Sequence, residues 1–186
     1  MSKQHNFCKA IVAAVLCAMV AGCAHQTSPS AQINSGLAPF SSTRNQAVTL
    51  VASTKHSLGA EDLNTLAVAY TALQEKANAY ADFMIEAVSA SSFDTAKNAK
   101  YSADLGQAIA GFDRVFNQLE GGRRSTIAGE WVPSFAQTLQ ARWNQYSGYV
   151  ATMPAQTKAE LIADLKRETV WPNYEDIATE PVAITR

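Results

Sequence analysis

The 186-residue chain has few of the residues on which most catalytic and metal sites depend. It contains three histidines and three cysteines, and no group of them has the spacing of zinc or haem ligands. The phosphate-binding loop, the dinucleotide pattern GxGxxG and the serine motifs GxSxG and SxxK are missing from the sequence. These absences predict a protein with no cofactor, no metal ion and no catalytic residue.

The first 23 residues have the pattern of an export signal. Lys3 and Lys9 precede a mostly apolar, uncharged stretch over residues 10–22, and two small residues come just before Cys23. A basic start, an apolar segment of about 7–15 residues and small residues at the cut are typical of a secretory signal. The stretch is shorter than the roughly 20 residues that a membrane-spanning helix needs. The sequence therefore predicts cleavage rather than a permanent transmembrane anchor.

The run Val-Ala-Gly-Cys that ends at Cys23 resembles the lipobox of bacterial lipoproteins. The resemblance implies that residues 1–22 form the signal peptide and that the sulfur of Cys23 carries diacylglycerol. It also implies a further acyl chain, such as palmitate, on the new amino group of Cys23. Because Ala24 rather than aspartate follows the cysteine, the resemblance favours the outer membrane of a Gram-negative cell, with the body facing the periplasm. Two or more acyl chains give stable anchoring, and each buried methylene contributes ~0.8 kcal/mol.

The positions of the cysteines agree with this interpretation. Cys8 and Cys17 lie within the signal, so Cys23 is the single cysteine of the mature chain and no intramolecular disulfide can form. A lone thiol is a liability in an oxidising compartment, and attachment to lipid removes it. An ordinary secretory signal cut near Cys23 is the alternative interpretation.

Composition limits the class of the mature protein. About 164 residues follow the signal, enough for one domain with a buried core. The chain has 15 basic and 16 acidic residues, and loss of Lys3 and Lys9 brings the net charge to about −3. Nucleic-acid binding, which requires a strongly basic patch, is therefore not expected. Abundant alanine and sparse β-branched or aromatic runs favour helices over strands.

The apolar spacing predicts an all-α protein, an antiparallel bundle of about four to five helices with a flexible N-terminal tether. Residues 23–42 are rich in Ser, Gln, Thr, Asn and Pro and are expected to form a lipid-anchored flexible linker. The bundle domain is expected over residues 43–170. An extended C-terminal tail is expected over residues 171–186, where Pro181 opposes a long helix.

Within the bundle, the longest periodic segment repeats apolar residues at spacings of three and four over about four heptads. A short turn separates it from the next helix, which predicts an antiparallel hairpin, and Gly121–Gly122 is expected to end that second helix. A further helix is expected to begin near Ser125 or Pro133. The predicted helices cover residues 43–57, 60–91, 94–120, a segment reaching 149, and 154–169.

Two pairs of residues are candidates for an interface. Arg123 and Arg124 lie on a predicted turn, where they could contact lipid phosphates or peptidoglycan carboxylates. A solvated turn is the simpler interpretation of this pair. Trp171 and Tyr174 lie in the C-terminal segment, where aromatic residues could anchor a partner. Closure of one end of the bundle is an equal alternative for them.

Together these patterns predict a lipid-anchored accessory protein, not an enzyme, that binds an unidentified envelope protein through a helical surface. One alternative is a murein-acting enzyme with a carboxylate site, although no glutamate is followed by the serine that such enzymes carry. The other is a small-ligand carrier. A deep cleft holding a carboxylate of raised pKa would favour the enzyme, and a large dry cavity lined by Phe112, Phe116 and Trp143 would favour the carrier. A filled bundle with an exposed apolar strip would favour partner binding.

Overall fold

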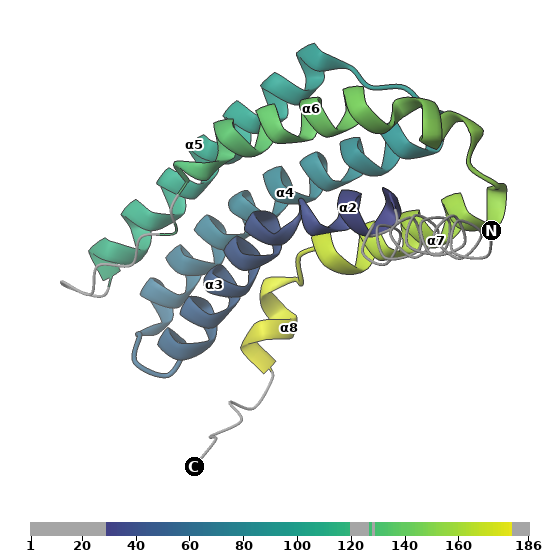
Figure 1. Ribbon diagram of the computed structural model, residues 1–186. Coiled ribbons are helices and arrows are strands. Elements are labelled where there is room, and N and C mark those ends of the chain that lie inside the picture. The colour runs from purple at the N-terminus through teal and green to yellow at the C-terminus, as the bar shows by residue number, and fades with distance from the viewer. Residues whose placement is uncertain (1–28, 120–126, 128, 180–186) are drawn as a thin grey trace, which may run out of the picture.

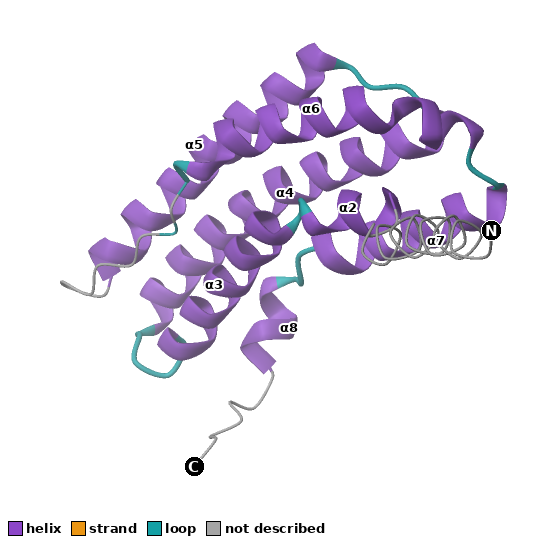
Figure 2. Ribbon diagram, viewed as in Figure 1, coloured by secondary structure: helices purple, strands orange, loops and turns teal. Residues whose placement is uncertain are grey.

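The computed structural model describes residues 29–119, 127 and 129–179, and its regular structure is entirely helical (Figures 1 and 2). The all-α class and the bundle predicted from the sequence are therefore confirmed. Among the described residues, no helix is both long enough and apolar enough to cross a bilayer. The helices are α2 (Pro29–Ser35), α3 (Ala38–Thr54), α4 (Ala60–Ala90), α5 (Thr95–Leu119), α6 (Trp131–Thr152), α7 (Ala155–Thr169) and α8 (Tyr174–Thr179).

Helices α4 and α5 form the predicted antiparallel hairpin. Helix α4 ends at Ser91, whose φ of 51° lies in the left-handed region, and the backbone N–H of Ser92 donates to the Ala87 carbonyl at 3.0 Å. This is the geometry of a Schellman cap. Helix α5 begins after Asp94, whose Oδ1 accepts hydrogen bonds from the backbone N–H groups of Ala96 and Lys97. Gly121–Gly122, the expected end of α5, lies outside the described residues.

The core lies where α3, α6 and α7 pack around this hairpin (Figure 1). The apolar residues that recur along α4 at spacings of three and four point into this core, and three of them, Tyr70, Leu73 and Tyr80, are fully buried. The Tyr80 hydroxyl donates to Asn98 Oδ1 at 2.7 Å, and Asn98 Nδ2 donates to the Ala136 carbonyl at 3.0 Å. Three helices, α4, α5 and α6, are thus joined by one buried polar chain.

The prediction of a flexible linker is wrong for residues 29–42. This segment contains α2 and the start of α3, and Leu37 and Phe40 are buried in the core. Its few larger apolar residues, Ile33 of α2, Leu37 in the turn and Phe40 of α3, together form one apolar face against the core. The packing partners of this face come from α4, α6 and α7, which a local reading of composition cannot include. Residues 23–28 lie outside the described residues.

The prediction of an extended tail is wrong for residues 174–179, which form a helix. Trp171 is buried, and α8 follows it. Helix α4 holds this segment through two side chains: Gln74 Nε2 donates to the Pro172 carbonyl at 2.9 Å, and Asn78 Oδ1 accepts the Trp171 backbone N–H at 3.0 Å. Residues 180–186 lie outside the described residues. The remaining predicted helices match α6, which begins at Trp131 between the two expected starts, and α7.

Candidate interaction surfaces

The structure describes two of the five residues that the sequence singles out. Cys23, Arg123 and Arg124 lie outside the described residues, so their roles stay predictions. Trp171 is 2% exposed, and its ring centroid lies 6.4 Å from that of Phe40. An interface role for Trp171 is therefore wrong. Its side chain packs inside the bundle, because Phe40 of α3, an aromatic partner, lies in the segment that composition predicts to be a linker.

Tyr174 belongs to the same aromatic group. Its side chain is half-buried, its ring centroid lies 6.3 Å from that of Tyr70, and its hydroxyl is 3.5 Å from the Leu63 carbonyl. The Tyr70 hydroxyl in turn donates to the Pro172 carbonyl at 3.0 Å, and burial raises the pKa of Tyr70. The structure thus brings Trp171 and Tyr174 together, but as the closure of the bundle and not as an exposed anchor.

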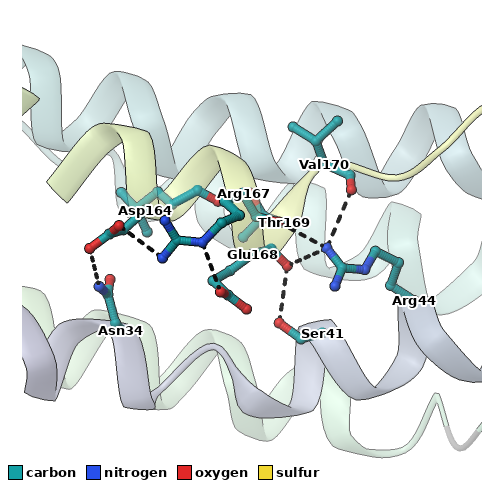
Figure 3. A network of polar contacts seen from close by, with 9 residues as sticks. Asn34, Ser41, Arg44, Asp164, Arg167, Glu168, Thr169 and Val170 are labelled. Carbon is teal, nitrogen blue, oxygen red and sulfur yellow. Dashed lines mark hydrogen bonds and ion pairs between the residues drawn. The ribbon is translucent and has the colours of Figure 1, made fainter. Parts of the chain in front are cut away.

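Polar contacts join the two ends of the described chain along what we call the terminal seam, α2 and α3 against α7 and α8 (Figure 3). Arg44 Nη1 donates to the carbonyls of Arg167 at 3.2 Å and Glu168 at 3.0 Å, in the last turn of α7. Ser41 Oγ donates to the same Glu168 carbonyl at 3.0 Å. Helix C-termini leave carbonyls without intrahelical donors and carry partial negative charge, so an arginine there satisfies both needs.

Further polar contacts lie on either side of the Arg44 and Ser41 contacts along the terminal seam. Lys55, the residue that follows α3, donates through Nζ to the carbonyls of Ile177 at 2.9 Å and Ala178 at 3.1 Å, which places a second cation at the end of α8. At the other end, Asn34 Nδ2 donates to Asp164 Oδ2 at 3.3 Å. The donor groups of Asn34, Ser41, Arg44 and Lys55 thus hold the two ends of the described chain together, which makes the terminal seam a structural element of the bundle.

The enzyme alternative calls for a carboxylate of raised pKa in a cleft. Burial raises the pKa of Asp113, a half-buried residue of α5, although a hydrogen bond from the Ile127 backbone N–H to its Oδ1, at 3.1 Å, acts in the opposite direction. This contact fixes Ile127 against α5. Asp113 does not line the cavity or grooves described below, so the arrangement gives the enzyme alternative no support.

The carrier alternative calls for a large cavity. The enclosed apolar space beneath α2 measures about 40 Å³ and is lined by Met84, Phe135 and Trp143 among others. A water molecule takes up roughly 30 Å³ of liquid, so this space is too small for an organic ligand. Phe112 and Phe116 do not line it; their rings stack against each other at 6.0 Å. The predicted ligand site is therefore not formed by these three residues.

Helix α5 is flanked by two shallow grooves, and we call this region the α5 flank. The groove between α4 and α5 holds about 430 Å³, and Val68, 63% exposed, lies on its edge. The groove between α5 and α6 holds about 690 Å³. Of the described residues that line either groove, none is charged. By contrast, charged residues line the comparable grooves along the terminal seam, Arg167 and Glu168 in one and Lys55 and Glu175 in the other.

Sequence reasoning missed the α5 flank, although a signal for it exists. Ala99, Ala103, Gly106 and Ala110 line the α5–α6 groove and recur at spacings of three and four. The three alanines are exposed. They form a second stripe on α5, beside the stripe of larger apolar residues that enters the core. Small residues give little hydrophobic contrast, so the larger stripe dominates the pattern.

Comparison with known proteins assigns no relative to this chain. No family model, no curated protein and no solved structure matches it. Among the described residues, no group of three or more His, Cys, Asp and Glu side chains lies close enough together to hold a metal ion.

Proposed function

We propose that the protein is a lipid-anchored accessory protein of the cell envelope that binds a helix of another envelope protein along the α5 flank. The anchor is Cys23, with diacylglycerol on its sulfur and an acyl chain on its amino group. The membrane is the outer membrane, and the helical body lies in the periplasm. The support for the anchor is the Val-Ala-Gly-Cys run at the end of an export signal.

The observation that carries the binding proposal is the uncharged, open α5–α6 groove. Its floor contains small residues, and a Cβ atom built on Gly106 would have no neighbouring atom within 4 Å. Small residues on two adjacent helices let the backbone of a third helix approach closely, and an apolar helix face in this position would remove the exposed alanines from water. Depletion of charge is also the compositional mark of the centre of a protein interface.

The binding proposal is tested by photo-crosslinking from within the groove. A photoreactive amino acid at Gln107, exposed on the α5–α6 groove, is expected to yield a discrete adduct with an envelope protein in intact cells. The same amino acid at Glu160, exposed on α7, serves as the control and should not yield that adduct. Equal adducts from both positions would overturn the assignment of the binding surface.

A matched pair of charge variants tests the same surface by affinity. Ala103→Glu places a carboxylate in the α5–α6 groove, and Ala163→Glu places one on the exposed face of α7. We expect at least about a tenfold loss of co-purified partner for the first variant, because an unpaired charge buried in an interface is costly. The second variant should bind as the wild type does. If neither the wild type nor either variant recovers a partner, and the purified wild-type protein degrades murein, the murein-enzyme alternative replaces this proposal.

The anchor is tested separately from the partner. Mass spectrometry of the mature protein should find Cys23 as the first residue with acyl modifications on its sulfur and amino group. An unmodified chain that begins at Ala24 would show an ordinary secretory signal and would remove the membrane-anchoring part of the proposal.

A further inference from the structure

One end of the bundle gathers uncharged segments from three parts of the chain. Helix α4 ends there and α7 begins there, beside the end of α6 (right in Figure 1). Lys158 Nζ donates to Ser91 Oγ at 2.8 Å, and Ser91 Oγ lies 3.5 Å from the Val150 carbonyl. These contacts tie the α4–α5 turn to the α6–α7 turn. We call this region the Ser91 end.

Helix α2 begins close to the Ser91 end. Its Gln32 accepts two hydrogen bonds from α6, from Arg142 to the backbone carbonyl and from the Tyr146 hydroxyl to the side-chain oxygen. Further along, Asn34 contacts Asp164 and Ser41 contacts Glu168, so α2 and α3 run in the same direction as α7. Pro29, the first residue of α2, therefore lies beside the first half of α7, near the end of the bundle where α7 begins.

The chain between the predicted anchor and α2 is short. Five residues separate Cys23 from Pro29, and six residue-to-residue steps can span at most about 20 Å. Helix α4, with 31 residues, is about 45 Å long by comparison. Acyl chains on Cys23 would therefore hold the start of α2 within about 20 Å of the leaflet.

The Ser91 end is also suited to a lipid surface by its charge. No charged residue occurs in residues 26–43, 87–93 or 143–157. Several of the residues exposed at this end are small or polar, such as Ser92, Thr152 and Ala155, and the amphipathic ring of Tyr149 is 36% exposed within one turn of the end of α6. The acidic group that starts α5, Asp94, is engaged by two backbone N–H groups. Exposed acidic groups near this end include Asp94 and Glu86, and they are accompanied by the cations Lys97, 3.8 Å from Glu86, and Lys158, so that anionic lipids would meet charges of both signs.

We propose that the Ser91 end faces the lipid bilayer, so that the bundle stands on the membrane with the α3–α4 connection pointing away from it. This orientation rests on the proposed lipid anchor at Cys23. The occupant of the Ser91 end is the headgroup region of the leaflet into which the acyl chains insert. The grooves of the α5 flank then run along the membrane normal and remain open to a partner in the periplasm.

The orientation is tested with the lipidated mature protein in vesicles of phosphatidylethanolamine and phosphatidylglycerol that contain a headgroup spin label. Since lipid occupies the Cys23 sulfur, an introduced cysteine is the single reactive thiol for a fluorescent probe. Thr152→Cys places the probe at the Ser91 end, and His56→Cys places it at the opposite end; both positions are exposed. Circular dichroism of each labelled protein confirms folding.

We expect the probe at residue 152 to be quenched at least about fivefold more strongly than the probe at residue 56, because about 45 Å of helix separates the two ends. Equal quenching, or stronger quenching at residue 56, overturns the orientation. Flotation with the vesicles distinguishes the two levels of the proposal. If the protein floats but the two probes are quenched equally, the lipid anchor is supported and only the proposed orientation is contradicted. If Cys23 is unmodified and the protein does not float, both the anchor and the orientation are contradicted.

Discussion

The α4–α5 hairpin and the terminal seam hold the same bundle together by different means. The hairpin joins neighbours in sequence through long apolar faces, with one buried polar chain from Tyr80 through Asn98. The seam joins segments more than 120 residues apart, and two cations, Arg44 of α3 and Lys55 just after it, donate to carbonyls at the ends of α7 and α8. The comparison shows that helices too short or too polar to pack by periodicity alone can still belong to a core when their ends are capped from elsewhere.

The largest expected effect comes from a substitution in α3, and it tests whether the helices of the seam contribute as much to the free energy of unfolding as the hairpin does. Phe40→Ala should lower the free energy of unfolding by about 3–5 kcal/mol, as core truncation of an aromatic does. Phe40 is 1% exposed, and its ring contacts those of Tyr80 and Phe135. Urea denaturation measures the change, with the exposed Val68→Ala as the control. A loss below about 1 kcal/mol would show that α3 contributes little to the core, and the seam would then not be comparable with the hairpin.

A smaller effect is expected inside the hairpin. Tyr80→Phe removes the donor to Asn98 Oδ1 and leaves that buried oxygen without its 2.7 Å hydrogen bond, which should cost about 1–3 kcal/mol. Tyr149→Phe, on a ring that is 36% exposed, should change the urea midpoint little. Equal stability of the Tyr80 variant and the wild type would show that the hairpin is held by apolar packing alone.

The charged side chains of the terminal seam should differ in how much each contributes to the free energy of unfolding. Arg44→Met removes the donor that reaches several carbonyls at the end of α7, and we expect a loss of about 1–2 kcal/mol. Arg167→Met removes ion pairs from a side chain that is 68% exposed, and the expected loss is below about 0.5 kcal/mol. Urea denaturation of both variants ranks them. The reverse order would mean that surface ion pairs, not helix capping, hold the seam.

The smallest effect concerns pH. Burial raises the pKa of Asp113 above its ordinary value of 3.8, so the folded protein binds this proton more tightly than the unfolded chain does. Its contribution to stability is complete below about pH 3.8 and is lost as the pH rises through the higher pKa. Asp113→Asn keeps an oxygen acceptor for the Ile127 N–H. The urea midpoint of this variant, relative to wild type, should rise between about pH 4 and 7, and a pH-independent difference would contradict the assignment.

The sequence predicted the hairpin because its determinants are local. Leu66, Leu73 and Tyr80 of α4, which recur every seven residues, are buried as their spacing indicates, and Asp94 caps α5. The seam could not be predicted because nothing near Arg44 shows that Glu168 will be its partner. The same holds for Leu37 and Phe40, whose apolar partners lie on distant helices. The α5 flank carried a faint pattern of small residues, and which face stays exposed is decided by tertiary packing.

The parallel course of α2–α3 and α7 has a mechanical consequence. A pull on the N-terminal segment would act along the direction in which these helices lie side by side, so contacts such as Asn34–Asp164, Ser41–Glu168 and Arg44–Glu168 would be loaded together in shear rather than opened one after another. If the acyl chains hold Cys23 and a partner is bound on α5, a force between them acts on the hairpin at one end and on the N-terminal segment at the other. The terminal seam then carries that force between the two.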